Sequence, residues 1–153
     1  MFYLLGGSAL LLLGSPRETL DVDYMVEPAP EADARLRLAL ETLATELQLD
    51  LELISIGEFI PLPPQARERR RLVGRYGQLE VCIFDLYSIA LSKVARGFES
   101  DLEDVVFMLH QGLIEFGELE RLFNIILPAA PKADISRTEF RAYFDEIRRR
   151  VKG

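Results

Sequence analysis

The chain has 153 residues, a length that suits one domain or a small domain with an extension. Apolar residues make up 49% and charged residues 28%, so the chain can bury a core and is not a disordered tail. One cysteine and one histidine exclude an internal disulfide and Cys/His zinc sites, and a net charge of −7 argues against broad nonspecific nucleic-acid binding.

The first part of the chain predicts strands that alternate with helices. In chain order these are a buried strand at 2–5, a short helix at 7–14, a strand at 20–26, an amphipathic helix at 31–48 and a strand at 49–56. A proline-rich and then basic loop follows at 57–71, and a further strand at 79–85.

The remainder predicts helices. Asp85 is suited to cap a helix that Gly97 ends, and Ser-x-x-Glu capping boxes begin at Ser100 and Ser136. The predicted helices cover 86–97, 101–112 and 139–152. Phe140, Tyr143 and Phe144 lie at helical spacing and are expected in the core.

These elements indicate an α+β fold, in which helices flank a small mixed β-sheet and the C-terminal part is helical. We expect an α/β core at 1–98 and a helical extension at 99–153 that packs on it as one compact unit. No run reaches the roughly twenty apolar residues of a membrane span, and the single cysteine suits a reducing compartment. We therefore expect a cytoplasmic protein without a membrane partner.

Asp21 and Asp23 lie two residues apart on one predicted strand, so both carboxylates project from the same face. Two neighbouring carboxylates repel unless a cation joins them, and Mg²⁺ accepts one or two carboxylates and completes its shell with water and phosphate. Gly6, Gly7 and Ser8 form a turn before a helix and offer backbone N–H groups to phosphates. Together the two motifs predict metal-assisted phosphoryl or nucleotidyl transfer, with Mn²⁺ as the alternative to Mg²⁺.

The order of these motifs in "YLLGGSALLLLGSPRETLDVDYMV" (3–26) resembles the DNA polymerase β-like nucleotidyltransferase superfamily. Within it, the chain looks most like the AbiEii-type nucleotidyltransferases of bacterial toxin–antitoxin and phage-defence systems. Those proteins add a lysine-bearing helix and an aspartate-rich segment, here "ALSKVARGFESDLEDV" (90–105). The resemblance covers roughly residues 3–110 and is strongest at the first motif.

The resemblance implies roles for the matching positions. Asp21 and Asp23 would hold the metal and, with Lys93 and Asp101, form the catalytic set; Asp101 or Asp104 would supply a further carboxylate. The nucleotide contacts would come from Gly6, Gly7, Ser8, Arg17, Thr19 and Lys93.

Two questions stay open in the sequence. Polymerase-like members use a third carboxylate on a neighbouring strand, for which the candidates besides Asp101 and Asp104 are Asp50, Glu52 and Glu80. The basic runs at 67–75 and 148–152 are either solvated or bind an acceptor.

The sequence thus predicts a magnesium-dependent nucleotidyltransferase that moves NMP from an NTP to an acceptor hydroxyl on RNA or tRNA, a protein or a small molecule. The first alternative is a catalytically degenerate nucleotidyltransferase fold that serves as a binding or antitoxin-like module. The second is a helix-rich protein-interaction module. The identity of the NTP, the acceptor and the oligomeric state do not follow from the sequence.

Overall fold

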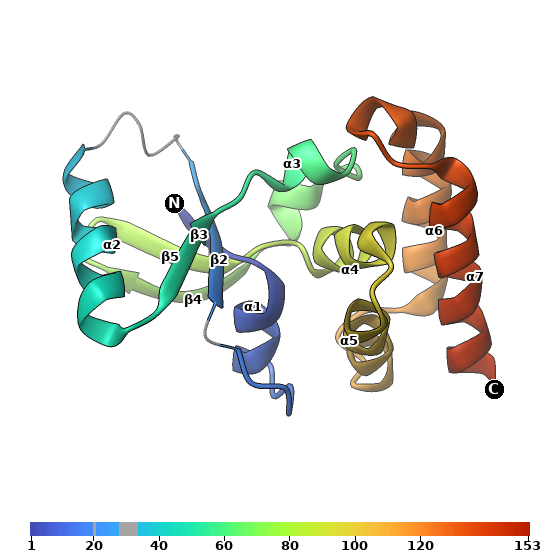
Figure 1. The fold of residues 1–153 in the computed structure, drawn as a ribbon, viewed down its shortest axis with the longest axis horizontal. Coiled ribbons are helices and arrows are strands. Elements are labelled where there is room, and N and C mark those ends of the chain that lie inside the picture. The colour runs from blue at the N-terminus through green and yellow to red at the C-terminus, as the bar shows by residue number, and fades with distance from the viewer. Residues whose placement is uncertain (20, 28–33) are drawn as a thin grey trace. The chain divides into compact units, whose positions relative to one another are not determined.

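The computed structural model describes residues 1–19, 21–27 and 34–153 (Figure 1). These residues form two compact units, each built from two stretches of the chain. The first contains Met1–Ser55 and Arg70–Phe84, and the second contains Ile56–Arg69 and Asp85–Gly153. The helix after Asp85, which the sequence analysis assigned to the α/β core, belongs to the second unit.

The first unit is a five-stranded mixed sheet with two helices. Its elements are β1 (Phe2–Leu4), α1 (Gly6–Leu12), β2 (Asp21–Val26), α2 (Ala34–Leu47), β3 (Asp50–Leu53), β4 (Arg71–Tyr76) and β5 (Leu79–Ile83). The strand order is β3-β2-β1-β5-β4. The pairs β1–β5 and β2–β3 are parallel, whereas β1–β2 and β4–β5 are antiparallel. The predicted mixed-sheet fold class is confirmed; residues 31–33 of the predicted helix at 31–48 lie outside the described residues.

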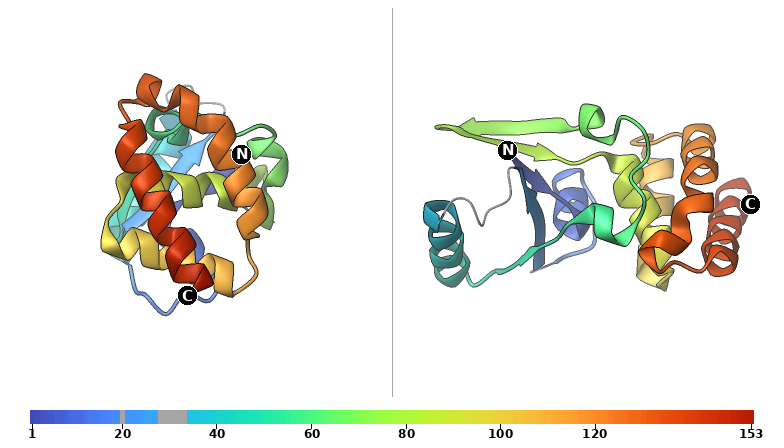
Figure 2. Two further views of the ribbon diagram at one scale, coloured as in Figure 1. Left: turned by 90° about the vertical axis from the view of Figure 1, so that its right-hand side faces the viewer. Right: turned by 90° about the horizontal axis from the view of Figure 1, so that it is seen from above.

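The two helices lie on opposite sides of β1 and β2 (Figure 2). On the α2 side, Phe2, Tyr24 and Val26 form a small core cluster, in which the Phe2 and Tyr24 rings stack at 5.0 Å. On the other face, the Tyr3 ring meets Phe84 edge-on at 5.2 Å. Because side chains alternate along a strand, neighbours of Tyr24 such as Asp23 point to the α1 side.

The predicted loop at 57–71 is wrong in part. It contains α3 (Ile56–Phe59) and a 3-10 helix, η2 (Ala66–Arg69), and the strand β4 that follows was not predicted. β4 begins and ends among charged and exposed residues because it is the last strand of the sheet, and edge strands carry charge that discourages further pairing. Gly77, with φ +64°, allows the two-residue turn from β4 to β5.

The second unit is helical. Besides α3 and η2 it contains α4 (Leu86–Arg96), α5 (Glu99–His110), α6 (Phe116–Ile126), a 3-10 helix η3 (Leu127–Ala133) and α7 (Arg137–Lys152). The Phe123 ring stacks on Phe144 at 4.1 Å and meets Phe140 at 4.8 Å, which joins α6 to α7. Phe140 and Phe144 are buried as predicted, and Tyr143 is half-buried.

Three of the four predicted helix ends are confirmed. The Asp85 carboxylate accepts from the N–H groups of Tyr87 and Ser88, Gly97 ends α4 in the left-handed region with φ 71°, and the Ser136 hydroxyl accepts from the N–H of Glu139. The capping box at Ser100 is wrong, because α5 starts one residue earlier and Phe98 is its N-cap without a side-chain bond.

No helix in the described part of the chain is both long and apolar enough to cross a bilayer.

Candidate functional site

The Gly-Gly-Ser turn and the Asp-Val-Asp strand meet in the first unit. The Leu5 N–H donates to the Asp23 carbonyl at 2.9 Å, which continues the β1–β2 pairing up to the turn. Gly6 then adopts φ +56°, and the Asp23 carboxylate fills the space that a side chain on Gly6 would need. The carboxylate of Asp23 therefore lies against the start of α1.

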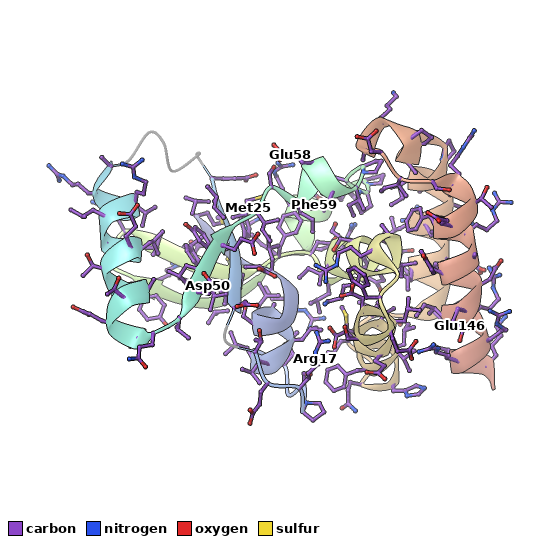
Figure 3. The ribbon with its side chains drawn as sticks, viewed as in Figure 1. Arg17, Met25, Asp50, Glu58, Phe59 and Glu146 are labelled. Carbon is purple, nitrogen blue, oxygen red and sulfur yellow. The ribbon has the colours of Figure 1, made fainter. Side chains whose placement is uncertain are left out.

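Ser8, Thr19 and Arg17 are further residues that the sequence assigned to the nucleotide contacts. The Ser8 hydroxyl donates to the Leu5 carbonyl at 3.0 Å, and Thr19 lies about 3.5 Å from the position of a Cβ on Gly7. The Thr19 hydroxyl accepts from the Asp21 N–H at 3.2 Å, which orients the start of β2. Arg17 is exposed on the segment between α1 and β2 (Figure 3).

The register of β2 and β3 places four carboxylates on one face. Asp21 lies opposite Asp50, and Asp23 lies opposite Glu52 (Figure 3 labels Asp50 on β3). Neighbouring strands lie about 4.8 Å apart, so facing carboxylates repel at this range. In the described structure no basic side chain forms an ion pair with Asp21, Asp50 or Glu52.

Glu80 is on the same face but farther away. Asp23 is level with Leu5, which follows β1, and Leu5 is level with Phe84, which follows β5. Glu80 precedes Phe84 by four residues, which is about 13 Å along a strand, and β1 separates its strand from β2. Its carboxylate pairs with Arg75 at 3.4 Å.

Two carboxylates on one face, Asp21 and Asp23, fit a hard divalent cation that keeps water and phosphate in the rest of its shell. Asp23 is half-buried and Asp21 is exposed, so such an ion would remain open to a substrate. Within the described residues, no three acidic, histidine or cysteine side chains converge to form a metal cluster. The carboxylates in register with this pair are Asp50 and Glu52 of β3.

Lys93, Asp101 and Asp104 come together in the second unit. The buried Lys93 ammonium donates to Asp104 at 2.7 Å and to Asp101 at 3.2 Å, and Arg96 donates to Asp101 at 2.9 Å. The side chains of Lys93 and both aspartates are at most 7% exposed. These ion pairs join α4 to α5. The roles that the resemblance gives these three residues stay predictions.

A further ion pair, between the half-buried Arg69 and the buried Asp85, was not predicted from the sequence. Arg69, at the end of η2, donates two hydrogen bonds to Asp85 at 2.7 and 2.8 Å, and its hydrogen bond to this carboxylate raises its pKa. Nothing in the run "RERRR" distinguishes the arginine that pairs with Asp85 from the other arginines beside it.

The arginines of the C-terminal basic run are paired as well. Arg148 pairs with Glu120 and Asp145, Arg149 pairs with Glu146, and Arg150 pairs with Glu99 and Glu146. The hydrogen bonds of Arg150 raise its pKa. Much of the positive charge that the sequence places at 148–150 is therefore balanced by carboxylates of the same unit.

The first strand of this mixed sheet leads through Gly-Gly-Ser into a helix, and Asp-x-Asp lies on the adjoining strand, as the predicted nucleotidyltransferase site requires. Over residues 2–152 the chain matches the model of a family described as "Nucleotidyltransferase of unknown function (DUF6036)", and it belongs to that family. This family confirms the prediction that the chain is a nucleotidyltransferase. Neither a curated protein nor a solved structure matches the chain.

Proposed function

We propose that this protein is a magnesium-dependent nucleotidyltransferase that transfers NMP from an NTP to an acceptor hydroxyl. The observation that carries the proposal is the position of the Asp23 carboxylate against Gly6, since it joins the two halves of the predicted site. Membership of a nucleotidyltransferase family supports the same reaction class.

In this reaction the acceptor oxygen attacks the α-phosphorus, the bond to the bridging oxygen breaks, and pyrophosphate leaves while the hydroxyl proton passes to base or solvent. A bound Mg²⁺ would supply charge stabilisation of the attacking and leaving oxygens. Asp21 and Asp23 would hold the ion, and the N–H groups of Gly7 and Ser8 would contact the phosphates. Arg17 would meet the negative charge of the triphosphate.

The third carboxylate belongs to β3 in this proposal. Asp50 and Glu52 lie on the strand next to β2 and in register with Asp21 and Asp23, whereas Glu80 lies about 13 Å along the sheet and pairs with Arg75. Either β3 residue would supply the further ligand in this proposal.

The proposal extends to the AbiEii-type subfamily, and with it to a place in a toxin–antitoxin or phage-defence system. The support is the Lys93 segment, in which the lysine and both aspartates of the compared motif lie together. A role for Lys93 at a phosphate would require its ammonium to exchange one carboxylate partner for the substrate.

One observation favours a second candidate function. The described residues contain no converging group of three carboxylates, which fits a degenerate member that binds nucleotide without turnover. Binding and transfer therefore need separate measurements.

The test is incubation of the protein with Mg²⁺ and each α-labelled NTP in turn, in the presence of total RNA and lysate protein, followed by detection of labelled species. We expect label on an acceptor with the natural protein and none with Asp21→Asn/Asp23→Asn. Glu80→Gln is the matched control, because it removes a carboxylate from the same face outside the site. Transfer that survives in the double variant would refute the proposal, and nucleotide-induced stabilisation without transfer would favour the binding module.

A further inference from the structure

A cavity of about 330 Å³ lies between α2 and the sheet, within the first unit. Its walls are apolar side chains of both elements: Leu40 and Ala44 from α2, and Leu51 and Leu53 from β3. This size falls at the lower end of the roughly 300–1,000 Å³ typical of small-molecule sites. A small flat ligand fits it better than a polypeptide.

The helix above the cavity is loosely packed. No residue of α2 is buried, although the sequence predicted an amphipathic helix with a full apolar stripe. Leu36 and Leu40 contact the core cluster of Phe2, Tyr24 and Val26. Ala44 and Leu53 also line the cavity, and Leu53 is 46% exposed. The cavity is therefore partly open to solvent.

Tyr24 places a polar group at the cavity. Its side chain lines the cavity and is 8% exposed, and its hydroxyl reaches solvent without forming a hydrogen bond to another described residue. A ligand acceptor can therefore bind this hydroxyl without displacing a partner within the protein. Burial and then the charge of Glu41 raise the pKa of this phenol, so it remains a donor.

Two charged side chains complete the rim. Arg37 and Glu41 line the cavity and face each other at 3.7 Å, and both are about two-thirds exposed, so their ion pair is weak and can open for a ligand. The rim thus offers a hydroxyl donor, a carboxylate acceptor and a guanidinium donor, with no net charge. This set suits a neutral ring that carries N–H donors beside a carbonyl acceptor.

We propose that this cavity binds a nucleobase at a second site, on the opposite face of β2 from Asp21 and Asp23. Among the bases, guanine matches the rim best. Its ring N–H and exocyclic amino group can both donate to Glu41, and its carbonyl O6 accepts from Tyr24 or Arg37. The leucines would cover the two faces of the ring. The site is separate from the proposed transfer chemistry, because Tyr24 and its neighbour Asp23 point to opposite sides of the sheet.

The experiment is calorimetric titration of the full chain with guanosine in metal-free buffer, with inosine and adenosine as analogues. Guanosine lacks phosphate, so it probes the cavity and not a Mg²⁺–triphosphate site. We expect inosine, which lacks the amino group, to bind about tenfold more weakly, since a hydrogen bond to a charged group is lost. Tyr24→Phe keeps the ring that stacks on Phe2 and removes the hydroxyl, so the affinity for guanosine should fall about fivefold.

Ala44→Phe should abolish binding because the ring fills the cavity, and Leu43→Phe is the matched control on the exposed side of the same helix. Asp21→Asn/Asp23→Asn should leave the guanosine affinity unchanged. The proposal fails if guanosine does not bind, if Ala44→Phe binds it normally, or if only the aspartate double variant loses it. The proposal also fails if a guanine-containing RNA oligonucleotide binds the protein and guanosine does not, because the affinity would then come from the sugar–phosphate backbone. These outcomes are independent of label transfer from an NTP, so each proposal can fail alone.

Discussion

Gly6 and Gly7 are neighbours in the sequence, yet the structure requires glycine only at the first. Gly6 has φ +56° and no room for a side chain beside Asp23, whereas a Cβ on Gly7 would make ordinary contact with Thr19 at about 3.5 Å. The Gly-Gly-Ser motif predicts a turn at this point, and the structure places the positive φ at Gly6. A doubled glycine does not reveal which of its members turns the chain.

This difference gives a test at the residue scale. Gly6→Ala should displace the Asp23 carboxylate and strain the turn, so the rise in melting temperature on addition of Mg²⁺ and NTP should be lost. Gly7→Ala should retain more of that rise and should fold as stably as the natural protein. The measurement is thermal unfolding of both variants with Mg²⁺ alone and with Mg²⁺ and NTP. Equal shifts in the two variants would show that Asp23 does not hold the ion.

At the scale of elements, the sequence predicts best where one local rule acts alone. Asp85, Gly97 and Ser136 end or begin helices as expected, because cap residues act within one turn. Ser100 has the same pattern as Ser136 but lies inside α5, where the adjoining Phe98 takes the cap position. The missed strand β4 depends on a partner strand rather than on its own alternation, since only pairing with β5 defines it.

In the candidate site, too, the sequence predicts the local features and misses those that depend on a second element. Asp21, Asp23 and the glycine turn could be found from sequence because their spacing is local. The register that places Asp50 and Glu52 opposite them is a property of two strands, and it could not be read from either strand alone. The partners of Lys93 lie 8 and 11 residues away on another helix, so the sequence showed the residues but not their pairing.

The link between α4 and α5 provides a prediction of its own. Lys93→Met removes the buried ammonium that pairs with the Asp104 and Asp101 carboxylates, so we expect a loss of about 3–5 kcal/mol in the free energy of unfolding. Arg96→Gln should cost less than about 1 kcal/mol, because the arginine is 56% exposed. Urea unfolding of both variants measures these losses. An unchanged stability of Lys93→Met, with nucleotide binding lost, would instead support the phosphate contact that the resemblance implies.

At the scale of the whole molecule, the balance of charge decides how the protein responds to acid. The chain carries a net charge of −7, yet several of its arginines are engaged with carboxylates in the second unit. Arg150 connects α7 to α5 through Glu99 and also binds Glu146 on its own helix. Its hydrogen bonds lower the pKa of both glutamates below their ordinary value of 4.5.

A carboxylate whose pKa is lower in the folded than in the unfolded state stabilises the fold above its unfolded pKa, and this contribution disappears as the pH falls through the folded value. Arg150→Gln should therefore melt at a lower temperature than the natural protein at pH 7, and the difference should shrink as the pH falls below about 4.5. High salt should reduce the difference at pH 7, because the Glu99 and Glu146 pairs are accessible to solvent. Arg141→Gln is the control: Arg141 is an exposed arginine of α7 that forms no ion pair in the described structure, so its effect should be small at every pH. Melting curves from pH 3 to 8 in low and high salt measure both variants. A difference for Arg150→Gln that persists unchanged at pH 3 would mean that its packing, and not its charge, holds α7 to α5.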